Sequence, residues 1–254
     1  MTRLRVFVPF ALAAALAGAI AAHGATATNE CNGIRNCLRA QGPWVVVPAH
    51  GTASYLLDCP RRRGILAGLD ARVTSTDIHI WFDGQLSAPI SPGRTTTRYA
   101  FLHAVSGLHR RGAFQPLIGC IPVNPNSPSL MSAHLESGSP LLVSATKRTG
   151  QARTTTSASA APGPQLLLAA TTLSLRPGQV RTTTIGCISG QKLVDSWYAI
   201  AFRTVRVPNV ALADAVRVQR TPRGNKIAVS IATSEALPRG TGAEVQLGVM
   251  CSPS

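Results

Sequence analysis

One pattern occurs twice in this chain, first as Val45-Val46-Val47-Pro48-Ala49-His50-Gly51 and again as Leu173-Ser174-Leu175-Arg176-Pro177-Gly178. In each copy a strand-like run follows the turn and ends at a cysteine, Cys59 or Cys187, before a glycine turn and a further strand-like run. Alternating runs bounded by Pro/Gly turns are typical of antiparallel strands. The repetition therefore predicts two modules of similar construction.

The composition favours strands and turns over helices. The 254 residues are 45% hydrophobic and only 14% charged, which allows a buried core. They include 22 Gly and 18 Pro, residues that end helices and strands and form turns. Regular short strands with turn signals between them predict an all-β fold with a β-sandwich in each half.

The first residues have the features of an export signal. Arg3 and Arg5 precede an uncharged run over 6–20, and Ala25-Thr26-Ala27 fits a small-residue cleavage site. We therefore predict a signal peptide over 1–27 and a secreted or cell-envelope location. The alternative is a membrane anchor, for which the uncharged run is short. No later stretch is apolar enough to predict a transmembrane segment in the mature chain.

The cysteines predict a disulfide framework, since an even number in an exported chain indicates paired thiols. The spacing is 61 residues from Cys59 to Cys120 and 64 from Cys187 to Cys251, which favours those two pairs. Cys31 and Cys37 then close a small loop. No C-x-x-C or H-x-x-x-H spacing occurs, so we expect no metal site.

The predicted organisation has five parts. After the signal peptide comes an N-terminal segment (28–42) with the small disulfide loop, followed by a first module (43–123). A connecting segment (124–164) rich in Thr, Ser, Gly and Pro then leads to a second module (165–254). The alternative is a long surface loop within one larger domain. Pro116 within the strand predicted at 114–120 indicates an edge strand or a bulge.

The runs Pro48–Ala71 and Pro177–Ala199 resemble a module of uncharacterised exported proteins of the actinobacterial type. Its pattern is a Pro/Gly turn, a Thr-rich strand, a cysteine, a glycine turn and a strand of small residues. The resemblance implies a disulfide-linked, immunoglobulin-like sandwich for each half and an extracytoplasmic location. It implies no activity.

The chain is strongly basic, with a formal net charge of +15, and its arginines cluster in two places. Such charge favours contact with polyanions, and arginine suits phosphate recognition. We predict anion binding by Arg61, Arg62, Arg63, His109, Arg110 and Arg111. The alternative is that both clusters are ordinary solvated turns. No aromatic residues accompany them, so we expect no specific nucleic-acid binding.

Enzymatic motifs are missing from the sequence: it contains no G-x-S-x-G, Walker or dinucleotide-binding glycine pattern. Asp77 and His79 share one side of a predicted strand, but surface alternation explains them more simply. We therefore expect a non-enzymatic binding module without a cofactor, whose partner is an anionic cell-wall polymer or a surface protein. The alternatives are a structural surface or matrix protein, and a hydrolase with a site between the modules.

Overall fold

The computed structural model describes residues 30–33, 37–59, 64–83, 99–121, 134–135, 142–144, 153–155 and 166–253. Within these residues the regular secondary structure is β-strand, apart from one 3-10 helix, η1 (Val210–Ala215). The all-β prediction is confirmed. The predicted signal peptide at 1–27 lies outside the described residues.

The first half of the chain forms β1 (Leu38–Gln41), β2 (Trp44–Val47), β3 (Thr52–Asp58), β4 (Ile65–Val73), β5 (Ile78–Asp83), β6 (Tyr99–Ser106) and β7 (Gly112–Ile121). Strands β3, β6 and β5 form one antiparallel sheet in that order. Strand β7 pairs with β4 along one side and with β2 and β1, one after the other, along the second side. Two sheets thus enclose the first core.

The second half forms β11 (Leu166–Leu175), β12 (Val180–Gly186), β13 (Gln191–Phe202), β14 (Val216–Arg223), β15 (Lys226–Thr233) and β16 (Ala243–Pro253). Its pairing orders are β12-β15-β14 and β13-β16-β11. These correspond in sequence to β3-β6-β5 and β4-β7-β2 of the first half. In both halves the last strand, β7 or β16, therefore lies between two earlier strands of its sheet.

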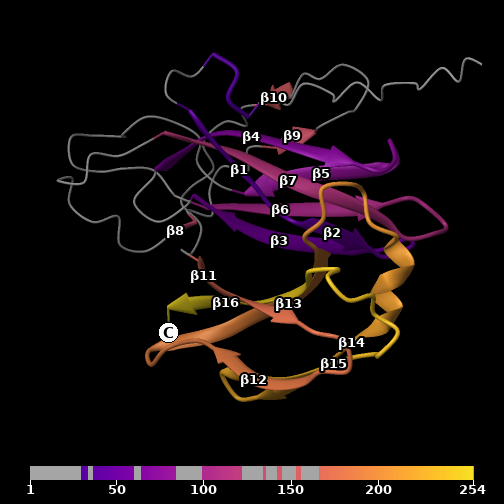
Figure 1. The fold of residues 1–254 in the computed structure, drawn as a ribbon. Helices are drawn as coiled ribbons and strands as arrows, with labels where there is room; N and C mark the ends of the chain where they lie inside the picture. The colour runs from indigo at the N-terminus through magenta and orange to yellow at the C-terminus, as the bar shows by residue number, and fades with distance from the viewer. Residues whose placement is uncertain are drawn as a thin grey trace, which may run out of the picture.

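The two halves share a sheet. Strand β2 pairs with β13 through Val45 opposite Ala201 and Trp44 opposite Phe202, which makes the central sheet continuous from one half to the other. Figure 1 shows the resulting layers, with β12, β14 and β15 at the bottom, β11, β13 and β16 above them, and the first-half strands at the top. Side chains at alternate strand positions form two hydrophobic cores, because successive side chains of a strand point to opposite faces.

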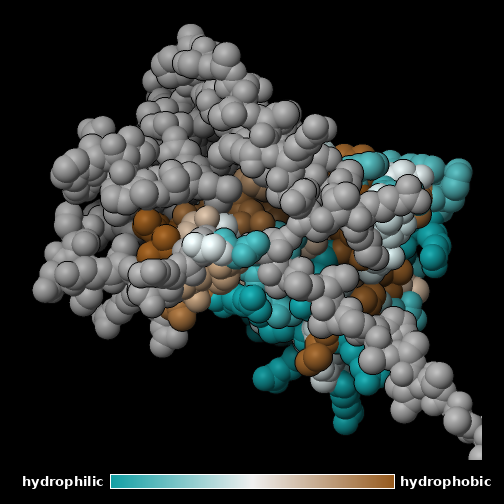
Figure 2. All heavy atoms as spheres, turned by 90° about the horizontal axis from the view of Figure 1, so that it is seen from above, coloured by the Kyte–Doolittle hydropathy of each residue, from teal (hydrophilic) through white to brown (hydrophobic). Residues whose placement is uncertain are grey.

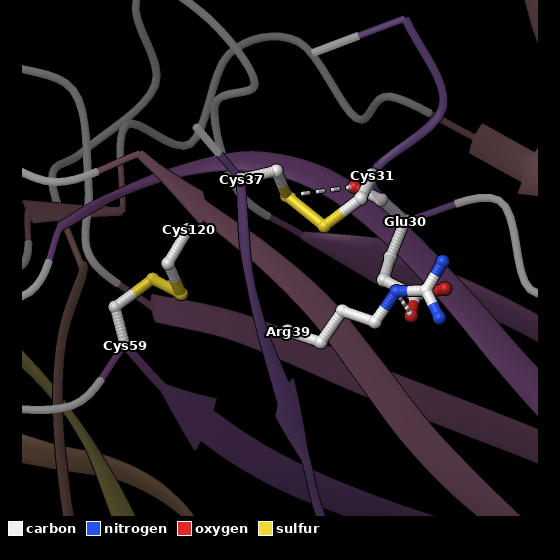
Figure 3. The surroundings of a disulfide bond; sticks show 6 residues. All are labelled: Glu30, Cys31, Cys37, Arg39, Cys59 and Cys120. Carbon is white, nitrogen blue, oxygen red and sulfur yellow. Dashed lines mark hydrogen bonds and ion pairs between the residues drawn. A yellow bond between two sulfur atoms is a disulfide. The ribbon is translucent and has the colours of Figure 1, made fainter. Parts of the chain in front are cut away.

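The three predicted disulfides are confirmed. Cys59 directly follows β3 and is bonded to Cys120 of β7, and Cys187 directly follows β12 and is bonded to Cys251 of β16. Each of these bonds joins the two sheets of its half, and all four cysteines are buried. The bond between Cys31 and Cys37 closes the small N-terminal loop, and Figure 3 shows it close to the Cys59–Cys120 bond.

A pair of glycines positions the N-terminal segment. Gly68 of β4 and Gly119 of β7 are register partners, and a Cβ atom on either one would overlap the carbonyl oxygen of Glu30. The absence of side chains lets the segment lie directly on the sheet. The carboxylate of Glu30 is buried and lies 3.2 Å from Nε of Arg39, as Figure 3 shows.

The prediction of an edge strand or a bulge at Pro116 is wrong. Strand β7 has neighbours on both sides, and its pairing with β4 is regular where Ala71 faces Pro116. Pro116 lies where β1 ends and β2 has not yet begun, and its carbonyl oxygen accepts a hydrogen bond from the Gly42 N–H at 2.9 Å. Proline has no N–H to donate, so the break between β1 and β2 is the place where a central strand tolerates it.

The predicted connecting segment contains three short strands: β8 (His134–Leu135), β9 (Leu142–Ser144) and β10 (Arg153–Thr155). Strand β8 pairs with β11, and β9 pairs with β10. The composition indicated a flexible linker, but open sheet edges can recruit short extended pieces. In the described part of the chain no helix has the length and apolarity needed to cross a membrane.

Candidate functional site

The basic loop predicted from the sequence connects β6 to β7. Its His109 and Arg110 are exposed, and Arg111 is half-buried. A guanidinium nitrogen of Arg111 lies 2.6 Å from a carboxylate oxygen of Asp214 in η1, so the loop contacts the second half of the chain. This ion pair compensates the charge of Arg111. Among the described residues no carboxylate forms an ion pair with Arg110, so its charge is available to a ligand.

The imidazole of His109 meets that of His50, from the turn between β2 and β3. Nε2 of His50 and Nδ1 of His109 are 2.8 Å apart, and the ring planes are nearly perpendicular at 82°. His50 has a φ of 46°, in the left-handed region that few non-glycine residues adopt. No local sequence pattern indicates this pair, because its members are 59 positions apart.

The first predicted arginine cluster, Arg61 to Arg63, lies outside the described residues, but its neighbours are described. Cys59 and Gly64 lie at the end of β7 that carries Cys120 and Ile121. The basic loop with His109 precedes the opposite end of β7, which is about 30 Å away for a ten-residue strand. The disulfide therefore does not bring the flanks of the first cluster next to the second cluster.

A further basic surface lies on the outer side of the sheet β12-β15-β14. The inward positions of β15 are the buried Ile227, Val229, Ile231 and Thr233, so the alternate positions and their partners point outward. The outward cations are Arg217, Arg223 and Lys226. The outward neutral polar residues are Thr182, Thr184, Gln219, Thr221 and Ser230. We call this surface the basic sheet face.

The charges of the basic sheet face stand at its two ends. Arg217 lies opposite Ala232 at one end, while Arg223 lies opposite Lys226 at the other. The two arginines are six positions apart, about 20 Å along the strand. The residues between them carry hydroxyl and amide groups, and Ala228 and Ser230 on the central strand are small, so a ligand can approach the sheet closely. Neither aspartate nor glutamate occurs in β12, β14 or β15.

The sequence carried part of the signal for this face. Alternation along β14 and β15 was predictable, but only the pairing with β12 places the threonines in the same surface as the cations. Arg220 belongs elsewhere, since its Nη1 donates to the Ser196 carbonyl at 2.9 Å and its guanidinium lies 5.0 Å from the Tyr198 ring centre. The basic sheet face is at the bottom in Figure 1 and is turned away from the viewer in Figure 2, which shows the molecule from above.

A polar cluster of Tyr55, Arg203 and Glu244 lies where the two halves meet, with the Arg203 side chain exposed. Arg203 donates from Nε and Nη2 to the two carboxylate oxygens of the buried Glu244, at 2.9 and 3.2 Å, and this bonding raises the pKa of Arg203. Burial, with a contribution from the Glu244 charge, raises the pKa of Tyr55 to about 12. A neutral phenol and a paired carboxylate fit a structural role between β3 and β16.

Of the two residues weighed for catalysis, Asp77 is held by a local hydrogen bond and His79 is not buried. The hydroxyl of Ser75 lies 3.3 Å from both the Asp77 carboxylate and the Asp77 N–H, in the turn before β5, and His79 is exposed. Ser54 and His103 form a cross-strand hydrogen bond of 2.9 Å, with the Trp81 ring stacked on the imidazole. Among the described residues no group of three His, Cys, Asp or Glu side chains is arranged to hold a metal ion.

No protein-family model, curated protein or solved structure matches this chain.

Proposed function

We propose that this is an exported, non-enzymatic protein that binds an anionic polymer of the cell envelope or its surroundings through the basic sheet face. The observation that carries the proposal is a surface with cations at both ends and no carboxylate in any of its three strands. A phosphate or carboxylate that binds to this surface is not repelled by negative charges in the three strands.

The separation of the cations favours a polymer over a small anion. A small anion would contact Arg217 alone, or Arg223 with Lys226, whereas a chain with repeated charges reaches both ends about 20 Å apart. The hydroxyl groups between the ends can hydrogen-bond to the sugars or phosphate oxygens of such a chain. Three disulfides, two of them buried, support an extracytoplasmic location for this binding.

We also propose that each half is an immunoglobulin-like sandwich module and that the two are arranged in tandem. Support comes from the matching pairing orders and from a disulfide that links the sheets at the same place in each half. In this arrangement β2 and β13 join the modules edge to edge, which leaves the basic sheet face on the outside of the second module.

The test is binding of the mature protein to purified cell-wall sacculi across a salt titration, with DNA as a competitor. A triple variant, Arg217→Glu, Arg223→Glu and Lys226→Glu, is compared with a control that reverses the exposed Arg176, Lys192 and Arg239. The control has the same net charge, so both variants lose equal long-range attraction.

We expect retention by the wild-type protein that falls steeply with salt, because bound polyanions release counterions. The face variant should lose most retention and about three units of the slope of log affinity against log salt. The control should keep most of both. Equal losses in the two variants would show that net charge alone causes retention, and no retention at low salt would exclude the polymer.

A structural role in association with other proteins is the second candidate, and the loop after β13 favours it. Val205 and Val207 are 94% and 52% exposed there. Exposed apolar side chains in a basic loop suit a protein contact. Sedimentation of the variant Val205→Ser, Val207→Ser against wild type tests this candidate, which predicts an assembly that only the wild type forms.

A further inference from the structure

We propose that His50 and His109 form a two-histidine site for a divalent transition metal of the copper or nickel type. The site is independent of the basic sheet face. It lies where the turn between β2 and β3 meets the loop between β6 and β7. Both imidazoles are exposed, and their facing nitrogens, Nε2 of His50 and Nδ1 of His109, are 2.8 Å apart. Imidazole is a preferred ligand of zinc, copper and nickel.

The backbone holds the two histidines in place. The N–H of His50 donates to the Leu108 carbonyl at 3.0 Å, which ties the two loops together beside the rings. The Gly51 N–H donates to the Pro48 carbonyl at 3.2 Å, which closes the turn around His50. On the other loop, the Leu108 N–H donates to the Ser106 hydroxyl at 3.2 Å. Both ligands therefore come from loops whose relative position is fixed.

The conformation of His50 is a second, independent observation. It is the non-glycine residue with a positive φ among the residues that the structure describes. A turn of this kind usually carries glycine or asparagine at that position. Unfavourable backbone conformations concentrate where a side chain has a function. A histidine here places its imidazole against His109, which a glycine would leave without a partner.

The ligand type indicates the class of metal. The two rings are hydrogen-bonded to each other at 2.8 Å, so one of the facing nitrogens carries a proton and the other presents its lone pair. When the protonated ring changes tautomer, both nitrogens are free to bind one ion. Imidazole ligands suit copper and nickel among the divalent metals. Copper(II) should bind most tightly, following the general affinity order of divalent ions.

The surroundings indicate what completes the coordination. Because no third His, Cys, Asp or Glu among the described residues joins the pair, the remaining positions are open to water or to an external ligand. Arg110 is next in the chain to His109 and is exposed, and the charge of Arg111 is compensated by Asp214. A cation beside the metal favours an anionic external ligand, such as a carboxylate or a phosphate.

The test uses the mature protein without a histidine tag, titrated with copper(II), nickel(II) and zinc(II) salts near neutral pH. Calorimetry gives stoichiometry and affinity, and electron paramagnetic resonance of the copper form counts nitrogen ligands. The variants are His50→Gly and His109→Ala. Glycine suits a positive φ, so His50→Gly removes the ligand without straining the turn. The matched control is His79→Ala, which removes another exposed histidine.

We expect one copper(II) ion per chain, bound through two imidazole nitrogens and at least tenfold more tightly than zinc(II). Either dyad variant should weaken copper binding at least tenfold, while His79→Ala leaves it unchanged. Binding should also weaken on acidification, because protons compete for the imidazoles. No copper binding by the wild type, undiminished binding in either dyad variant, or a spectrum without two imidazole nitrogens would overturn the proposal.

Discussion

The side-chain amide of Gln246 makes both hydrogen bonds that a neighbouring strand would make with Leu56. Its Oε1 accepts from the Leu56 N–H at 2.7 Å, and its Nε2 donates to the Leu56 carbonyl at 2.8 Å. Leu56 lies in β3, at the edge of its sheet, and Gln246 is a buried residue of β16. One side chain thus closes a sheet edge of the first half against the second half.

Replacement of Gln246 by leucine should destabilise the whole protein. Leucine keeps the volume but leaves the Leu56 N–H and carbonyl without partners, at a cost of about 2–4 kcal/mol in the free energy of unfolding. Urea unfolding measures the change. Gln41→Leu, at an exposed position of β1, is the control and should cost less than about 0.5 kcal/mol. Equal effects of both variants would contradict the structural role of Gln246.

Stability should fall at alkaline pH because of Tyr55. The folded pKa of about 12 lies above the ordinary tyrosine pKa of about 10, so the fold favours the neutral phenol. The contribution of the neutral phenol to the free energy of unfolding is complete below about pH 10 and is lost as the pH rises towards 12. The loss is about 2 kcal/mol at about pH 11.5. Tyr55→Phe lacks the ionisable group. Its unfolding free energy relative to wild type should therefore rise between about pH 8 and about pH 11.5, and a constant difference would contradict the assignment.

A methyl group at Gly119 should displace the N-terminal segment. The Cβ of Gly119→Ala would overlap the Glu30 carbonyl and crowd Cys37. We expect a loss of about 1–3 kcal/mol and faster proteolysis near residue 30, measured by mass spectrometry of a limited digest. Gly107→Ala is the control, since its nearest atom would be the Asp77 carbonyl oxygen at 3.7 Å. Unchanged cleavage in Gly119→Ala would show that the segment is not held there.

The disulfides should differ in their contribution. Loop-closure entropy gives about 4 kcal/mol for each of the bonds that close 61 and 64 residues, and about 2 kcal/mol for the bond that closes 6. Paired replacement by alanine, followed by thermal unfolding, measures this order. Mild reduction should also open Cys31–Cys37 first, because its cysteines are partly exposed. A larger loss from the short loop would contradict the order.

Much of the fold was predictable because its signals are local. Ile78, Ile80 and Phe82 alternate in the sequence with more polar residues, which is a local strand signal, and these three residues are buried in β5. The similar spacing of the cysteines, 61 and 64 residues, predicted the two long disulfides. Pro116 was misassigned for a non-local reason, because whether a proline is tolerated depends on which strand faces it.

The sequence by itself determined the all-β class, the disulfide pairs and the basic charge, because strand alternation, cysteine spacing and composition are properties of the chain read in order. Only the tertiary structure decided which residues meet. The pairing of β2 with β13, the Gln246–Leu56 bonds, the contact of His50 with His109 and the gathering of Arg217, Arg223 and Lys226 on one face all join segments that strand pairing brings together. Register and sheet order are set by the burial of whole faces at once, and no short stretch of sequence contains that information.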